Sequence, residues 1–381
     1  MSVTTLFLSI IPYLFPVSAQ SDFAIKTDKI DSLMQAHIVH DGKHPVHSFL
    51  LYAHNKTTGF EIHHGVGTVG RNDQEIDAGY QYNVASITKT VVATIILQLE
   101  EEGKLRVEDK AASYLRGLDY LKFDDFHFWH DSACANDLTI QQLLQHTSGI
   151  ADIFTDAATK FNISVLLHKK RQYTTEMIIQ KYYKYHLNKK AFNKPGLGYH
   201  YSDMNYMLLG FIIEQVTGKS LPQAIRERIL EPCGMTDTYF EFYESRQGNG
   251  KRIDAFLNRI NMTQNINTSY EWGGGGLVST TKDMASFIES LFDLKFFRLE
   301  STLNKMIDFS ATLNYGATYG LGIFKYELNG KVFYGHGGFY GSVLAYAPAE
   351  RVTFSANIGQ AIPPYDTGLL VQKLIDIILN P

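Results

Sequence analysis

The stretch Tyr82-Asn83-Val84-Ala85-Ser86-Ile87-Thr88-Lys89-Thr90 joins an extended, β-favouring segment to an apolar helix. Within it, Ser86 and Lys89 are three positions apart, and residues with this spacing share one face of a helix. The residues that follow, 91–99, are apolar enough to bury the helix. Burial disfavours the charged form of an amine. A desolvated Lys89 beside Ser86 could therefore act as the base for the serine hydroxyl.

A Ser-x-x-Lys pattern also occurs by chance, and motif matches carry false positives. In that case Ser86 caps the helix and Lys89 is a solvated residue of its first turn. The rest of the chain has to decide between these two readings.

Composition indicates an ordinary globular protein. The chain has 381 residues, of which 45% are hydrophobic and 19% are charged, so it has ample material for a core. Its net charge of -4 gives no sign of a nucleic-acid partner. Two cysteines, Cys134 and Cys233, do not make a disulfide framework.

Residues 1–19 have the pattern of a secretory signal peptide. An apolar run, Leu6 to Val17, precedes the small residues Val17-Ser18-Ala19 at the expected cleavage site, although the segment contains no Lys or Arg. The run is too short for a comfortable membrane span, so an uncleaved anchor is the weaker alternative. We therefore expect a secreted or periplasmic protein without a stable membrane span after cleavage.

Strand-like segments lie at both ends of the chain, and the middle is helical in pattern. We expect a first helix at 28–40, a hairpin of 47–54 and 60–66, further strands at 319–327, 331–335, 343–348 and 352–358, and a terminal helix at 369–379. This order predicts an α+β fold with one antiparallel sheet from both chain ends, flanked by helices. Residues 20–381 then form a single domain, with a sheet lobe at about 20–85 and 270–381 and a mostly helical lobe at about 86–269.

Two further polar motifs stand out. Tyr201-Ser202-Asp203 precedes an apolar helix, and Gly335-His336-Gly337-Gly338-Phe339 lies at a strand end. Each also has a purely structural explanation. Ser202 or Asp203 would cap the helix well, and the glycines could form a tight turn that holds a hydrogen-bonded histidine.

Together and in this order, the three motifs resemble the penicillin-recognising serine hydrolases. The closest group contains class C β-lactamases, D-alanyl-D-alanine carboxypeptidases, D-aminopeptidases and related esterases, and it carries Ser-x-x-Lys, Tyr-x-Asn, and Lys-Thr-Gly or His-x-Gly. The resemblance runs from about Lys29 to the last helix and includes the stretches 138–150, 231–238 and 275–280. Cys233 and Asp203 depart from the Leu and Asn that are usual in this family. The resemblance implies a β-lactamase/transpeptidase-like fold.

The resemblance also implies roles for individual residues. Ser86 would be the acylated nucleophile, Lys89 would share its proton, and Tyr201 would relay a proton to and from the leaving group. Whether Lys89 or Tyr201 is the acylation base stays open. The backbone N–H groups of Ser86 and Phe339 would form the oxyanion hole. The substrate would lie against Asp203, His336, Gly337 and Gly338.

Asp203 raises a separate question. A carboxylate near Lys89 would favour the charged ammonium and leave more of the proton transfer to Tyr201. The alternative is that Asp203 points elsewhere and caps the helix.

The expected activity is that of a secreted serine hydrolase acting through an acyl-enzyme, with no metal or cofactor required. A lysine at position 336 would carry a permanent charge for a substrate carboxylate, whereas a histidine is not reliably charged at neutral pH. His336 therefore favours a D-amino-acid peptide, such as a cell-wall peptide, or a small ester as substrate. The alternatives are a β-lactamase, a penicillin-binding sensor that is acylated but turns over little, and an inactive scaffold.

Overall fold

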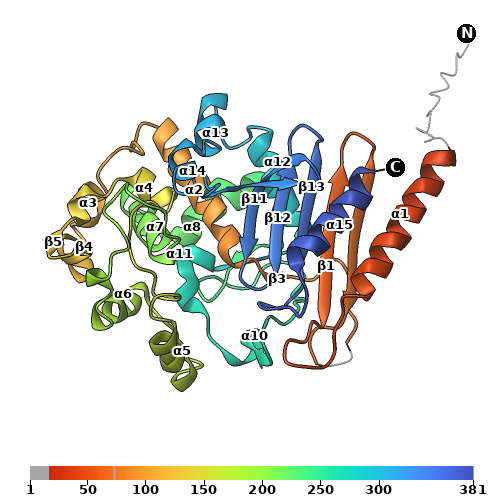
Figure 1. The fold of residues 1–381 in the computed structure, drawn as a ribbon, viewed down its shortest axis with the longest axis horizontal. Coiled ribbons are helices and arrows are strands. Elements are labelled where there is room, and N and C mark those ends of the chain that lie inside the picture. The colour runs from red at the N-terminus through yellow and green to blue at the C-terminus, as the bar shows by residue number, and fades with distance from the viewer. Residues whose placement is uncertain (1–16, 72–73, 381) are drawn as a thin grey trace, which may run out of the picture.

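The structure, a computed structural model, describes residues 17–71 and 74–380. Most of the predicted signal peptide therefore lies outside the described residues. The fold is α+β, as predicted, with a six-stranded antiparallel sheet and many helices (Figure 1). None of the described helices combines the length and hydrophobicity that a membrane span needs.

The sheet is assembled from both ends of the chain. Its strand order is β10-β11-β12-β13-β1-β2. The central contact is an antiparallel pairing of β1 with β13, in which Leu50 lies opposite Asn357. The six strands are β1 (Ser48–Asn55), β2 (Phe60–Gly67), β10 (Phe324–Leu328), β11 (Lys331–Gly338), β12 (Ser342–Ala347) and β13 (Val352–Asn357).

Helices cover both faces of this sheet, and its central strands β1, β12 and β13 are almost entirely buried. Successive residues of β1 point to opposite faces. Leu51 belongs to the core beneath α1 (Val17–Gln35) and α15 (Thr367–Leu379), whereas Leu50 belongs to the core shared with the helical region. On that second side, α12 (Thr281–Phe292) packs against β1, β12 and β13.

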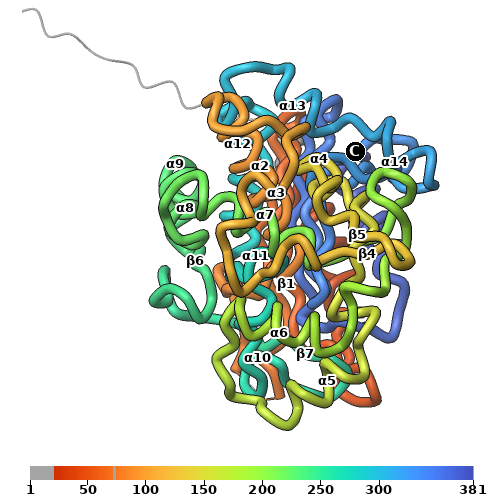
Figure 2. Tube along the Cα trace, turned by 90° about the vertical axis from the view of Figure 1, so that its left-hand side faces the viewer, coloured from red at the N-terminus to blue at the C-terminus, as the bar shows by residue number. Residues whose placement is uncertain are grey.

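The helical region surrounds α2 (Thr88–Glu101), whose residues are almost all buried. A helix that is apolar on all sides belongs inside a domain, and α2 indeed packs against α7 (Asp203–Thr217) and α11 (Trp272–Gly275) (Figure 2). The remaining helices are α3 (Ala112–Leu115), α4 (Ile140–Leu144), α5 (Ala158–Leu167), α6 (Thr175–Lys184), α8 (Leu221–Ile225), α9 (Glu231–Cys233), α10 (Met262–Asn265), α13 (Glu300–Met306) and α14 (Ser310–Leu313).

Small strands complete the fold. A three-stranded sheet, β3-β9-β6, consists of β3 (Tyr82–Asn83), β9 (Leu277–Ser279) and β6 (Tyr239–Phe240). Its strand β3 leads directly into Ser86. Two hairpins pair β4 (Phe128–Trp129) with β5 (Ser132–Ala133), and β7 (Phe256–Leu257) with β8 (Ile260–Asn261).

Candidate active site

Ser86 and Lys89 lie at the start of α2, where a 3-10 turn, Ala85–Ile87, precedes the helix. The Lys89 Nζ atom donates to the Ser86 Oγ atom at 2.9 Å, so the predicted contact is present. Ala85 has a φ of 48°, a left-handed conformation that is unfavourable for a residue with a Cβ. Strain of this kind is characteristic of functional sites, where the surrounding structure enforces it.

Lys89 is completely buried and uses all three of its N–H donors. Besides Ser86, its Nζ atom contacts the Asp203 Oδ1 atom at 2.5 Å and the Gly274 carbonyl oxygen at 2.7 Å. Three acceptors match the three protons of an ammonium group. The arrangement therefore holds a charged Lys89 in contact with the serine.

Asp203 faces Lys89, and Ser202 supplies the helix cap by accepting a hydrogen bond from the Met204 N–H at 3.2 Å. The sequence left open whether Asp203 lies near Lys89 or caps the helix. In the structure it lies near Lys89, and its neighbour Ser202 caps the helix. The Asp203 N–H donates to the buried Asp152 Oδ1 atom at 2.8 Å. Burial and the adjacent Asp203 carboxylate raise the pKa of Asp152 to about 7.

Tyr201 also lies close enough to Ser86 to interact with its side chain. Its ring centroid lies 5.0 Å from Lys89 Nζ and 4.1 Å from the ring centroid of His146. Burial, reinforced by the charge of Asp203, raises the pKa of Tyr201 well above its usual range. The resting phenol is therefore protonated and can donate a hydrogen bond.

His336 is buried on β11, with only 2% of its surface exposed. Its Nδ1 atom lies 2.6 Å from the Gly337 carbonyl oxygen, which can only accept, so Nδ1 carries the proton. Its Nε2 atom then accepts from the Tyr319 hydroxyl at 3.1 Å. Burial and the charge of Lys89 lower the pKa of His336 to about 3, so the ring is neutral at physiological pH. Its contact with substrate stays a prediction.

The end of β11 packs closely against the segment before Ser86. A Cβ at Gly338 would lie 2.2 Å from the Val84 carbonyl oxygen, so only glycine allows this approach. At Gly337 the nearest atom would be 3.8 Å away. Phe339, the next residue after β11, has 53% of its surface exposed. The predicted oxyanion-hole peptides of Ser86 and Phe339 thus belong to segments in direct contact.

A buried polar network supports strand β3, and sequence reasoning missed it. The Arg252 guanidinium forms an ion pair with Glu241 and donates to the Asn83 Oδ1 atom at 2.5 Å. Asn83 in turn donates to the Glu241 Oε2 atom at 2.9 Å. These residues are far apart in the sequence, so no local pattern could have revealed them.

The loop after α4 supplies a second group of missed residues. The His146 Nδ1 atom accepts from the Ser202 N–H at 3.2 Å and lies 3.0 Å from the Asn205 Nδ2 atom. These contacts fix the backbone next to Tyr201. The only sequence signal was that His146 falls in the stretch 138–150, which resembles the family. Asp152 lies just beyond that stretch.

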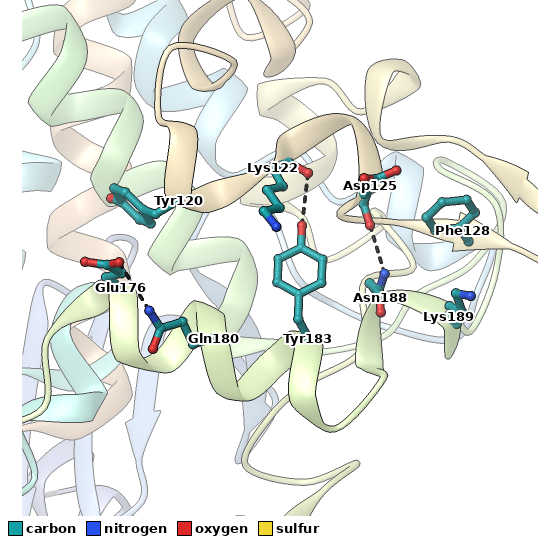
Figure 3. A pocket seen from close by; sticks show the side chains of 9 residues that line it. All are labelled: Tyr120, Lys122, Asp125, Phe128, Glu176, Gln180, Tyr183, Asn188 and Lys189. Atoms are coloured by element: carbon teal, nitrogen blue, oxygen red, sulfur yellow. Dashed lines mark hydrogen bonds between the residues drawn. The ribbon is translucent and has the colours of Figure 1, made fainter.

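The Ser86 site does not coincide with the surface pocket in Figure 3. That pocket has a volume of about 680 Å³ and lies between α6 and the turns around residues 119–125. Several of its polar groups are already satisfied, for example by the Tyr183 hydroxyl donating to the Leu121 carbonyl oxygen at 2.7 Å. In the described ranges, no cluster of three or more His, Cys, Asp or Glu side chains could hold a metal ion.

Comparison with known sequences identifies one protein family. The sequence profile of the family described as Beta-lactamase matches residues 29–364. A protein from Escherichia coli (strain K12) named "Putative D-alanyl-D-alanine carboxypeptidase" is 30% identical over 321 residues, covering 72% of this chain and 68% of the relative.

Solved structures show the same fold. A D-stereospecific amidohydrolase from Streptomyces sp. has a TM-score of 0.72 at 23% identity, over 91% of this chain and 97% of that one. A D-amino acid amidase from Ochrobactrum anthropi SV3, complexed with D-phenylalanine, has a TM-score of 0.76 at 18% identity, over 93% and 99%.

Proposed function

Because this chain belongs to the beta-lactamase family of serine hydrolases, we propose that it hydrolyses D-amino-acid amides or peptides, or small esters, through an acyl-enzyme on Ser86. The observation that carries this proposal is the contact of Lys89 Nζ with Ser86 Oγ at 2.9 Å, inside a buried site that also holds Tyr201. Acyl transfer to a serine requires a nucleophile in contact with a base.

In the proposed reaction, Lys89 acts as the base. Once it has lost its extra proton to solvent, its amine accepts the proton of the Ser86 hydroxyl as Oγ bonds to the acyl carbon. The Ser86 and Phe339 N–H groups stabilise the negative charge that develops on the acyl oxygen. Tyr201 fits the role of proton donor to the leaving group, because its raised pKa keeps the phenol protonated. The Lys89 ammonium formed in this way returns a proton to Tyr201. Water then attacks the acyl carbon, and its proton passes through Lys89 to Ser86 Oγ as the acid is released.

The neutral His336 supports the choice of substrate class. Its ring offers no permanent cation for a substrate carboxylate, which a β-lactam carries. The names of the relatives, a D-alanyl-D-alanine carboxypeptidase and two hydrolases of D-stereospecific or D-amino-acid amide bonds, support the same class. We therefore propose β-lactams as slow substrates or acylating inhibitors, and a cell-wall peptide as one natural source of the D-amino-acid bond.

We also propose that the chain acts outside the cytoplasm. The support is the apolar run and small-residue site within residues 1–19. N-terminal sequencing of the protein recovered from its native source would test this, since a first residue near position 20 is expected.

The decisive experiment combines labelling with kinetics. Intact-mass measurement after treatment with a fluorophosphonate should show one adduct that Ser86→Ala abolishes. The kcat/KM should then be compared for a p-nitrophenyl ester, a D-alanyl peptide and a chromogenic cephalosporin. Faster turnover of the cephalosporin than of both others would make the protein a β-lactamase. An adduct that forms without turnover of any substrate would make it a sensor.

A further inference from the structure

Glu271 lies beside the nucleophile and has no role in the mechanism above. Its Oε2 atom lies 3.1 Å from the position that a Cβ would occupy on Gly275, and the Ala85 carbonyl carbon lies 3.5 Å from that same position. Ala85 and Ser86 share that peptide. A side chain at position 275 would press against both the carboxyl and the nucleophile segment, so glycine allows the two to lie close together.

Glu271 also contacts the residue that follows Phe339. Its Oε1 atom accepts a hydrogen bond from the Tyr340 hydroxyl at 2.6 Å, and Tyr340 follows Phe339 directly. On the other side, the same short segment provides the Gly274 carbonyl oxygen that holds Lys89. The carboxyl is thus held by Tyr340, and it lies three residues before the carbonyl group that holds Lys89.

Within the described part of the chain, no Lys, Arg or His forms an ion pair with Glu271, and its Oε2 atom has no hydrogen-bond donor. Most of the charged groups near Glu271 are carboxylates. Burial, reinforced by the Glu241 and Asp203 carboxylates, raises the pKa of Glu271 to about 8, while the hydrogen bond from Tyr340 and the charge of Lys89 act in the opposite direction. A half-buried acceptor with one free oxygen, next to a nucleophile, is suited to a cationic donor from outside the chain.

We propose that Glu271 binds the α-ammonium group of a D-aminoacyl substrate and so selects substrates with a free amino group. This inference rests on the proposed function and deepens it, because it makes the enzyme an aminopeptidase or amino-acid amidase instead of a carboxypeptidase. A carboxypeptidase substrate offers its charge on the leaving-group side, whereas Glu271 lies next to the peptide that precedes the acylated serine.

Glu271 and the amino group of a substrate have similar pKa values, which favours their pairing. The α-amino group of a peptide has a pKa of about 7.7–8.0, close to that of Glu271. When the two groups meet, they can share one proton as carboxylate and ammonium without exchanging a proton with solvent. In a partly buried site, such a charge-assisted hydrogen bond is stronger than it would be on the surface.

The test uses Glu271→Gln with two matched substrates, D-alanine p-nitroanilide and its N-acetylated form. Glutamine keeps an oxygen that can accept from Tyr340, but it carries no charge. We expect kcat/KM for the free-amine substrate to fall at least about 10-fold, as for loss of one partner of a desolvated ion pair. The value for the acetylated substrate should stay within about twofold, so the ratio of the two is the readout.

Two control variants separate recognition from structure. Tyr340→Phe removes the hydrogen bond to Glu271 but keeps the carboxyl, so the substrate ratio should stay near that of the wild type. Glu214→Gln replaces another half-buried carboxyl, at the far end of α7, and should also leave the ratio unchanged.

Equal losses on both substrates with Glu271→Gln would show a merely structural role and overturn the inference. A wild-type preference for the acetylated substrate would also overturn it. In both cases hydrolysis that depends on Ser86 would leave the proposed function standing. If no p-nitroanilide or p-nitrophenyl ester is hydrolysed in a manner that depends on Ser86, the proposed function fails and the inference fails with it.

Discussion

The Lys89 Nζ atom lies 2.5 Å from the Asp203 Oδ1 atom, so an ion pair stands in direct contact with the serine that we propose as nucleophile. The family pattern has a neutral amide at the position of Asp203. A carboxylate there favours the ammonium form of the lysine. The ion pair therefore stabilises the Lys89 ammonium more than an asparagine at position 203 would.

Replacing Asp203 by Asn should make this proton easier to lose. The acidic limb of the plot of kcat/KM against pH should move to lower pH in Asp203→Asn, because the ammonium loses its carboxylate partner. Steady-state hydrolysis of a p-nitrophenyl ester between pH 5 and 9 measures this shift. An acidic limb that stays in place, or moves to higher pH, would show that Asp203 does not hold the proton on Lys89.

Tyr201→Phe should distinguish substrates by their leaving group. Loss of a general acid costs about 10²–10⁴-fold, but only where the leaving group needs a proton. We expect kcat for D-alanine amide to fall by about 10²-fold or more and kcat for a p-nitrophenyl ester to fall much less. Lys89→Ala should impair both substrates strongly. Equal effects of Tyr201→Phe on both would argue that Tyr201 is the acylation base instead.

Gly338→Ala should damage catalysis through the backbone. Its Cβ would lie 2.2 Å from the Val84 carbonyl oxygen, so the end of β11 must move away from the Ser86 segment. Loss of one oxyanion-hole donor costs about 10²–10³-fold in kcat, and we expect a fall in that range. Gly337→Ala is the matched control for folding, since its Cβ meets nothing closer than 3.8 Å. Its melting temperature should equal that of the wild type, and similar kcat values for Gly338→Ala and wild type would refute the proposed hole.

Arg252→Met should destabilise the fold, because it leaves the Glu241 carboxylate buried without its partner. Breaking a buried ion pair in this way costs about 3–5 kcal/mol. Urea unfolding measures the loss, and the double variant Arg252→Met, Glu241→Gln should recover part of it. If the double variant is less stable than the single one, the two side chains do not act as a pair.

Sequence patterns predicted the elements that depend on local chemistry. The hairpin of β1 and β2 follows from two strand-like segments joined by turn residues, and the structure confirms it within a residue or two. The contact of Lys89 with Ser86 needs only the spacing of a helix. The antiparallel sheet built from both chain ends is likewise confirmed, because strands at both termini had few other partners.

Local patterns were less accurate where tertiary contacts decide the geometry. In the stretch 138–150, α4 ends at Leu144, and His146 then adopts a left-handed conformation and bonds to the segment of Tyr201, which no local pattern indicated. The first helix extends from Val17 to Gln35, so it begins and ends earlier than the predicted 28–40. The carboxyls of Asp152 and Glu271 were missed for the same reason. Their surroundings come from segments that are distant in the sequence.

The pairing of β1 with β13 also constrains how the chain reaches this structure. The strand near residue 50 can pair only when the strand near residue 355 is present. The centre of the sheet therefore forms only after residues up to about 357 have been synthesised. Contacts of such long sequence separation slow folding, because chain entropy is lost before the contacts form. Until then the nascent β1–β2 hairpin presents an unpaired edge, which is a template for association with other chains. The arrangement that builds the site thus leaves one edge of β1 without its partner until β13 is available.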